Sequence, residues 1–308
     1  MKLYTFEVGG ERRIGAECNR QLIDLATSYA ALTQLRGLKG GTLHTLPADM
    51  LAFLRGGKSA TQAARDTVAF MAKRPAVPMG QRLSYPFDAV KILAPLPRPG
   101  KILCSGINYR GHKEENPDAK MPSEPFFFSK LPSAIIGPGE PVITPPQTNQ
   151  LDYEVEFAVV IGHVMRCTPE SEVIDCIAGY TILHDVSARD VQFKDNQITL
   201  GKNFDTFCPL GPCIVTRDDL PDPGNVKLRS FLNGKLMQDG STADWMFPLP
   251  RLLSFLSGVM TLEPGDVVST GTPAGVGVFR KPQIFLKPGD VVRLEIEGIG
   301  VLENPVAA

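Results

Sequence analysis

Nine residues near the middle of the chain, Asp152 to Val160, alternate between acidic and apolar side chains before turning wholly apolar. Such alternation is typical of a β-strand, in which successive side chains point to opposite faces. The apolar residues then cover one face, and the other face carries three acids, Asp152, Glu154 and Glu156. This second face continues as Ala158 and Val160, which is not the pattern of a solvated surface. The chain is therefore expected to bury a row of carboxylates on a sheet.

Three neighbouring carboxylates repel one another, and each raises the pKa of the others. A divalent cation would remove this penalty, and a solvated outer face is the alternative. A second acidic string, His184 to Asp190, ends an apolar strand candidate. An aspartate from this string, Asp185 or Asp190, can complete a three-carboxylate site with Glu154 and Glu156. Because every proposed donor is an oxygen, the pattern favours a hard ion, Mg²⁺ or Mn²⁺.

Composition indicates a globular protein with many strands. The 308 residues include 29 Gly and 27 Pro, more than the usual ~12% for the two together, which indicates tight turns between strands. The 32 Lys and Arg nearly balance the 33 Asp and Glu, which argues against a nucleic-acid or membrane-surface partner. No apolar run approaches the ~18 residues of a membrane span. The sequence contains no Cys-x-x-Cys pair, so this zinc-binding pattern is absent. We therefore expect a cytoplasmic protein.

The first ninety or so residues differ in pattern from the rest. Residues 3–7 and 13–17 predict a hairpin around a Gly-Gly turn, and residues 25–35 and 60–72 predict two helices. The proline-rich run Pro95-Leu-Pro-Arg-Pro-Gly100 marks a boundary near residue 95. The prediction is an α+β, β-rich chain with a small N-terminal α/β domain over 1–95 and a catalytic domain over 96–308.

Four strings occur together in one order: the acidic strand, His184 to Gln192, Gly201 to Pro209, and Ser269 to Gly277. Together they resemble the fumarylacetoacetate hydrolase family over about residues 100 to 306. The N-terminal segment is similar to the variable extra domain of longer bacterial members. The resemblance implies a mixed β-sandwich roll, a homodimer, and Mg²⁺ or Mn²⁺ bound by three carboxylates, Glu154, Glu156 and Asp185.

The same resemblance implies further site residues. Arg189, Gln192 and Lys202 fall on positions that contact substrate or position water, and Thr272 lies in the loop that binds a substrate carboxylate. A Gly-Thr-Pro-Ala-Gly turn also exposes N–H groups and a hydroxyl to an anion. His112 and Glu115 match a dyad that activates water, although a His among Lys and Glu is more often a surface residue. Lys130 falls on a family position and is assigned no role.

The function implied is metal-dependent hydrolysis of a carbon–carbon bond in an acylpyruvate, the class of fumarylacetoacetate, fumarylpyruvate and 2,4-diketo sugar acids. The products are pyruvate and a carboxylic acid, with His112 taking a proton from water. The same site could serve an oxaloacetate decarboxylase or a 2-oxo acid isomerase or tautomerase, because ligands and fold do not choose among them. A scaffold that binds metal without catalysis would lack one of these residues, and all are present. The expected partner is a small-molecule 2-oxo acid.

Overall fold

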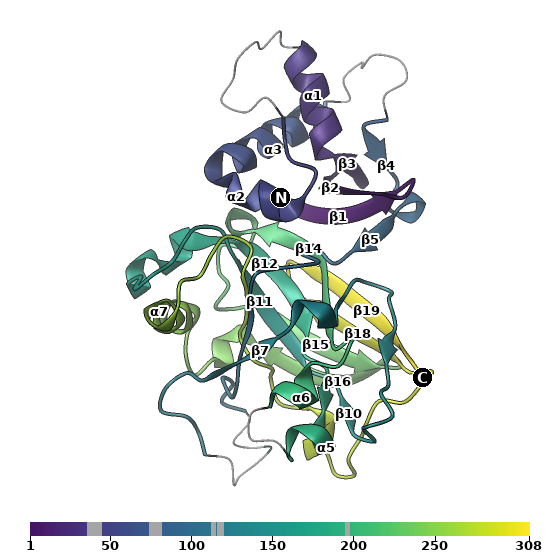
Figure 1. The fold of residues 1–308 in the computed structure, drawn as a ribbon, viewed down its shortest axis with the longest axis vertical. Coiled ribbons are helices and arrows are strands. Elements are labelled where there is room, and N and C mark those ends of the chain that lie inside the picture. The colour runs from purple at the N-terminus through teal and green to yellow at the C-terminus, as the bar shows by residue number, and fades with distance from the viewer. Residues whose placement is uncertain (36–44, 74–81, 112–114, 116–119, 195–197) are drawn as a thin grey trace.

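The structure is a computed structural model that describes residues 1–35, 45–73, 82–111, 115, 120–194 and 198–308. It is a sheet-rich α+β fold in which helices are few and short, so the predicted fold class is confirmed. Figure 1 shows a smaller upper part, built by the N-terminal segment, above a larger part built by the rest of the chain. None of the described helices is both long and apolar enough to cross a bilayer.

The N-terminal part carries the first five strands of the large sheet together with three described helices. Its strands are β1 (Lys2–Val8), β2 (Glu11–Cys18), β3 (Gln21–Asp24), β4 (Ser84–Tyr85) and β5 (Lys91–Leu93). Its helices are α1 (Leu25–Leu35), α2 (Met50–Arg55) and α3 (Gly57–Ala72). The predicted hairpin is the β1–β2 pair, and the two predicted helices are α1 and α3. The short helix α2 was not predicted; Asp49 caps it by accepting the Ala52 N–H over 2.9 Å.

The large sheet runs through both parts of the molecule in the order β4-β3-β2-β1-β14-β12-β11-β17-β6-β7, with β5 beside β1 and β8 beside β14. Its strands in the larger part are β6 (Ile102–Ser105), β7 (Phe127–Lys130), β8 (Ile135–Ile136), β11 (Val155–Ile161), β12 (Ile177–His184), β14 (Cys208–Thr216) and β17 (Val267–Ser269). Because β1 pairs with β14, the N-terminal segment extends the sheet that carries the acidic strand. The division at residue 95 stays a prediction.

A second sheet has the order β16-β15-β18-β19-β9, and a two-stranded ribbon joins β10 to β13. These strands are β9 (Val142–Ile143), β10 (Leu151–Asp152), β13 (Ser187–Ala188), β15 (Lys227–Leu232), β16 (Lys235–Ser241), β18 (Val291–Ile296) and β19 (Gly300–Ala307). The helices described in this part are α5 (Arg189–Gln192), α6 (Thr199–Lys202) and α7 (Leu249–Val259), with 3₁₀ turns at Pro132–Ala134, Glu170–Cys176, Arg217–Asp219, Thr242–Asp244 and Gly277–Phe279. A further 3₁₀ turn, Phe87–Ala89, lies between β4 and β5 of the N-terminal part.

The acidic strand lies in the middle of the core. All seven residues of β11 are buried. The ring centroid of Phe157 lies 5.1 Å from that of Tyr180 and 5.8 Å from that of Trp245. A strand covered on both faces cannot leave its acids in water. The carboxylates that β11 carries are therefore buried groups that need partners.

The predicted alternation fails at one of the three acids. The strand is broken, because β10 ends at Asp152 and β11 begins at Val155. The Asp152 carboxylate accepts the N–H groups of Tyr153, Gly277 and Val278 at 2.7–3.0 Å. It holds the loop after Val276 in place and does not join the other two acids.

Candidate active site

The pairing of two strands brings the distant acidic strings together. Val155 of β11 lies opposite His184 of β12, and just beyond this pair the N–H of Asp185 donates to the Glu154 carbonyl over 3.1 Å. Opposite residues point to the same face of a sheet, and so do residues two apart along a strand. Glu154, Glu156 and Asp185 therefore share one face. All three line a cavity of about 360 Å³.

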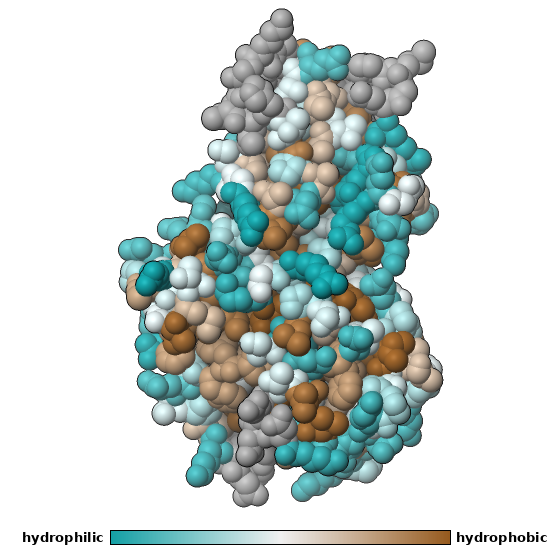
Figure 2. Space-filling view, in the orientation of Figure 1, coloured by the Kyte–Doolittle hydropathy of each residue, from teal (hydrophilic) through white to brown (hydrophobic). Residues whose placement is uncertain are grey.

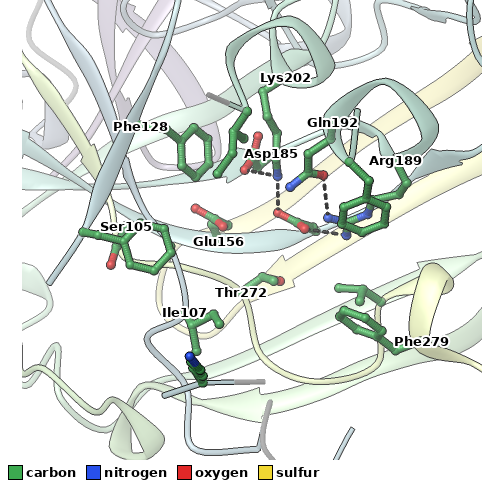
Figure 3. Close-up of a pocket in the computed structure, with 17 residues that line it drawn as sticks. Ser105, Ile107, Phe128, Glu156, Asp185, Arg189, Gln192, Lys202, Thr272 and Phe279 are labelled. Atoms are coloured by element: carbon green, nitrogen blue, oxygen red, sulfur yellow. Dashed lines mark hydrogen bonds and ion pairs between the residues drawn. The ribbon is translucent and has the colours of Figure 1, made fainter. Parts of the chain in front are cut away.

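Lys202 connects two of these carboxylates. It comes from the end of α6, is 2% exposed, and its Nζ donates to Glu154 over 2.8 Å and to Asp185 over 2.6 Å (Figure 3). Burial alone would lower the pKa of Lys202, but the charges of Asp185 and Glu154 outweigh it and leave that pKa raised. The lysine is therefore an ammonium ion at the floor of the cavity.

Glu154 and Glu156 differ sharply in electrostatics. Burial would raise the pKa of Glu154, but Lys202 and Arg189 lower it to about 2. Burial and the charges of Asp185 and Glu154 raise the pKa of Glu156 well above its usual value. The Ser269 hydroxyl donates to the Glu156 carboxylate and compensates only part of this effect. Burial and two neighbouring carboxylates thus both disfavour the charged form of Glu156.

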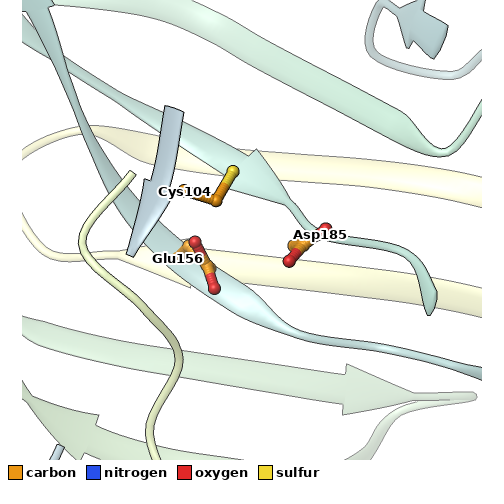
Figure 4. A group of neighbouring side chains, drawn as sticks. All are labelled: Cys104, Glu156 and Asp185. Atoms are coloured by element: carbon orange, nitrogen blue, oxygen red, sulfur yellow. The ribbon is translucent and has the colours of Figure 1, made fainter. Parts of the chain in front are cut away.

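One group of possible metal-donor atoms among the described residues contains a sulfur. Cys104, Glu156 and Asp185 each place one donor atom within 4.8 Å of the others, and Figure 4 shows Cys104 and Glu156 on strands and Asp185 just beyond the end of β12. Strand register explains this, because Cys104 lies opposite Ser269, which in turn lies opposite Ala158 on the face of Glu156. Glu154 stands outside this group, joined to it through Lys202.

The residues fit a hard divalent ion. Burial first, and then the charges of Asp185 and Glu154, raise the pKa of Glu156; a dication would offset the repulsion among these carboxylates, which supply oxygen donors. The sequence spacing allowed either Asp185 or Asp190 as the third carboxylate of the site. Of these two, Asp185 lines the cavity. Asp190 lies elsewhere, accepting the Thr148 hydroxyl over 2.5 Å and the Asn149 N–H over 3.0 Å.

Lys130 is a site residue to which the sequence assigned no role. Its side chain is fully buried, and its Nζ donates to Asp185 over 2.6 Å, to the Lys202 carbonyl over 2.6 Å and to the Val186 carbonyl over 3.3 Å. A buried ammonium with three acceptors fixes the position of the aspartate and of the chain that carries Lys202. The signal available in the sequence was a lysine directly after the run Phe126-Phe127-Phe128-Ser129. Ser269 and Cys104 gave no such signal.

Arg189 and Gln192 form one side of the cavity floor. The Arg189 guanidinium donates to Asp152 over 2.8 Å, to Glu154 over 2.5 Å and to Gln192 over 3.1 Å. Arg189 therefore links Asp152, which lies apart from the other two acids, to Glu154, because its guanidinium donates to both carboxylates. Because the guanidinium of Arg189 is bound to these protein groups, it orients Glu154 and Gln192.

Two further predicted residues, Thr272 and Glu115, contact β11 and the loop after β17. The Thr272 hydroxyl donates to the Val155 carbonyl over 2.9 Å and accepts from Gln238 over 2.8 Å, so it anchors its loop to β11. Glu115 accepts the Gly275 N–H over 2.7 Å, which places it beside the same loop. His112 lies outside the described residues, so the predicted dyad stays a prediction.

Comparisons with known proteins show which chains this one is similar to. A family model described as fumarylacetoacetate (FAA) hydrolase C-terminal matches residues 101–307. The mitochondrial oxaloacetate tautomerase Fahd2a of Rattus norvegicus is 43% identical over 277 residues, which are 88% of this chain and 85% of the relative. A fumarylacetoacetate hydrolase structure from Exiguobacterium antarcticum is 36% identical with a TM-score of 0.79, covering 100% of this chain and 99% of its own.

A maleylpyruvate hydrolase from Sphingobium sp. SYK-6, solved with manganese(II) and pyruvate, is 28% identical with a TM-score of 0.74 over 100% of this chain and 99% of its own. The predicted cytoplasmic location is contradicted: the rat tautomerase and its human and bovine counterparts are mitochondrial. Balanced charge and the lack of a long apolar run in the sequence do not depend on the compartment, so they could not distinguish the cytoplasm from an organelle.

Proposed function

The chain belongs to the fumarylacetoacetate hydrolase family, and from this premise we propose that it tautomerises oxaloacetate, moving one proton between carbon 3 and the 2-oxo oxygen. The observation that carries the choice is the 43% identity to a rat oxaloacetate tautomerase across most of both chains. The hydrolases compared above are 36% and 28% identical. We therefore place tautomerisation before carbon–carbon hydrolysis, which sequence reasoning had ranked first.

The cavity floor supports this chemistry. A divalent ion held by Glu154, Glu156 and Asp185, Mg²⁺ or Mn²⁺, would supply a Lewis acid where negative charge develops on the substrate. The Lys202 ammonium lies between Glu154 and Asp185, where it can donate a hydrogen bond to a substrate oxygen. Lys202 and Arg189 lower the pKa of Glu154, and Arg189 also donates a hydrogen bond to its carboxylate. These residues orient the 2-oxo acid and stabilise its enolate charge.

The proton transfer needs an acid–base group beside carbon 3. We assign it to His112 with Glu115, because Glu115 is held at the cavity loop by the Gly275 N–H. General acid–base help of this kind contributes about 10²–10⁴ in rate. In the enol-to-keto direction, the enol oxygen at carbon 2 loses its proton and carbon 3 gains one, so the atoms and charge of the substrate balance.

The test uses enol-oxaloacetate dissolved in dry solvent and diluted into buffer with the Mg²⁺- or Mn²⁺-loaded protein. Loss of the enol absorbance should accelerate in proportion to protein concentration, and chelator should abolish the acceleration. His112→Ala should slow turnover about 10²–10⁴-fold while leaving Mn²⁺ affinity unchanged. A protein that loads metal yet leaves the uncatalysed enol decay unaltered would refute the proposal.

Hydrolysis of an acylpyruvate is the second candidate, favoured by full-length similarity to solved hydrolases. It requires a water to reach the carbonyl beyond the 2-oxo group. Release of pyruvate from acetylpyruvate, fumarylpyruvate and 2,4-diketo sugar acids, measured beside loss of CO₂ from oxaloacetate, separates hydrolase, decarboxylase and tautomerase. The predicted homodimer is tested in the same preparation by light scattering.

A further inference from the structure

One buried side chain outside the cavity contacts both the acidic strand and loop 272–277, which follows β17. Figure 2 shows polar and apolar residues mixed over the surface of the larger part of the molecule. Gln238 of β16 lies beneath this surface, because it is 1% exposed, and it is not among the residues that line the cavity. A buried amide needs a partner for each of its polar groups, and those partners show what it holds in place.

The Gln238 amide makes four hydrogen bonds, two at its oxygen and two at its nitrogen, which uses its full capacity. The Oε1 atom accepts the Val155 N–H over 3.0 Å and the Ser230 hydroxyl over 2.9 Å. The Nε2 atom donates to the Thr272 hydroxyl oxygen over 2.8 Å and to the Pro273 carbonyl over 2.8 Å. The oxygen of the amide therefore binds the acidic strand, and the nitrogen binds the loop.

Three of these groups close a ring of hydrogen bonds. Val155 stands between Glu154 and Glu156 in the chain. Its carbonyl accepts the Thr272 hydroxyl over 2.9 Å, and the same hydroxyl accepts a hydrogen bond from Gln238. The ring is completed by the Val155 N–H, which donates to Gln238. Because the ring is buried, a shift of the loop along the strand would break these bonds without replacing them by bonds to water, which is unfavourable.

Loop 272–277 also packs directly on the backbone of β16. A Cβ on Gly275 would stand 2.4 Å from the Met237 carbonyl oxygen, and a Cβ on Gly240 would stand 2.4 Å from the Pro273 side chain. Only glycine allows so close an approach at these two positions. The Gly275 N–H donates to Glu115 over 2.7 Å, so the loop that is held on β16 in turn holds Glu115.

We propose that Gln238 is a positioning residue, which sets the separation between the carboxylates of the acidic strand and Glu115. It acts through Val155 and Thr272 and not by touching the substrate. The part of Glu115 in proton transfer rests on the proposed function, whereas the four contacts of Gln238 do not depend on it. A displacement of about 1 Å between reacting groups costs about 10²-fold in rate, so a residue outside the cavity can control turnover.

The test is Gln238→Met, which keeps the length of the side chain and removes its four hydrogen bonds. In the Mn²⁺-loaded full chain, kcat for enol-oxaloacetate should fall about 10²-fold. The Mn²⁺ affinity, measured by electron paramagnetic resonance, should stay unchanged because β11 keeps its pairing with β12 and β17. The matched control is Ser230→Ala, which removes a partner of the same amide oxygen and should leave kcat unchanged. A merely structural role would lower Tm in both variants without separating their kcat values.

A double-mutant cycle connects the effect to Glu115. In a Glu115→Gln background, Gln238→Met should slow turnover much less than it does in the parent chain, because the group that it positions is already altered. Should Gln238→Met fail to fold, Gln238→Glu keeps the oxygen that Val155 binds and changes only the side that donates to the loop. The same fall in kcat with unchanged Mn²⁺ affinity is expected of Gln238→Glu.

Hydrogen exchange gives a measurement that needs no turnover. The Gly275 amide of the metal-free full chain should exchange faster in Gln238→Met and at the parental rate in Ser230→Ala. Unaltered exchange in Gln238→Met would show that Gln238 does not hold the loop. An absence of tautomerase activity in the parent chain would refute the proposed function, and exchange at Gly275 would still decide whether Gln238 fixes the loop.

Three kinetic results would overturn the positioning role. An unchanged kcat in folded Gln238→Met would leave this residue a contribution to stability only. Parallel losses of kcat and Mn²⁺ affinity would make it a support of the acidic strand. Full additivity with Glu115→Gln would mean that its effect on turnover does not pass through Glu115.

Discussion

The charged floor of the cavity and the apolar residues that also line it, Ile107, Phe126, Phe193, Ile198, Val276 and Phe279, here called the apolar wall, are built in opposite ways. The floor comes from paired strands, and its charges are buried and bound to one another. The apolar wall comes largely from loops, and two of its rings are open to solvent. A floor set by strand register suits one chemistry held constant, whereas loop side chains can change without disturbing the sheet. The comparison implies that the floor determines the reaction and the wall selects the substrate.

The largest expected effect is at the floor. Asp185→Asn should eliminate detectable Mn²⁺ binding and lower turnover by about 10³-fold or more, because a Lewis acid contributes several kcal/mol. Free Mn²⁺ measured by electron paramagnetic resonance gives the affinity. Asp190→Asn, whose carboxylate binds Thr148 and Asn149, is the control and should retain binding. Equal loss in both variants would contradict the separate placement of the two aspartates.

Removal of the buried lysine should be the next largest effect. Lys130→Met leaves Asp185 without one of its two ammonium partners, and breaking such a buried pair costs about 3–5 kcal/mol of unfolding free energy. Urea unfolding measures it. Lys91→Met removes an exposed partner of Glu140 and should cost at most about 1 kcal/mol. Similar costs for the two would mean that Lys130 is not a buried support of the floor.

Glu156→Gln should raise the free energy of unfolding of the metal-free protein, whereas Lys130→Met should lower it. Because the folded-state pKa of Glu156 is raised, its favourable contribution to stability is present at low pH and is lost as pH rises toward that pKa. The glutamine variant should therefore exceed the parent by about 1 kcal/mol at pH 8 and by less at pH 5, while losing Mn²⁺ affinity. Unfolding with chelator at both pH values checks this. A gain that shrinks as pH rises would contradict the crowding of the three carboxylates.

The smallest effect is expected at the apolar wall. Gly106→Ala should displace the Phe126 ring, lowering affinity for the 2-oxo acid substrate, measured by calorimetry, by roughly 10-fold or less, with little change in Tm because the ring is free to move outward. Gly258→Ala, in open space on α7, is the control for the added methyl group. An unchanged affinity in Gly106→Ala would remove Phe126 from the wall.

Local pattern predicted those parts of the fold that depend on neighbouring residues. The Gly9-Gly10 turn gave the β1–β2 hairpin, and apolar periodicity gave α1 and α3. The alternation after Asp152 predicted a strand but missed its break, because the N–H groups that capture Asp152 come from residues 125 and 126 positions later. That contact is invisible to any local rule.

The amino-acid sequence by itself determined which residue types could form the site: a buried acidic strand, a second acidic string, and four family strings in order. Only the tertiary structure decided which of those acids meet. Strand pairing placed Asp185 beside Glu154 and left Asp190 outside, and the parallel contact of β6 with β17 added Cys104. The physical reason is that alternation fixes the face of a side chain within one strand, whereas pairing between distant strands fixes which faces come together.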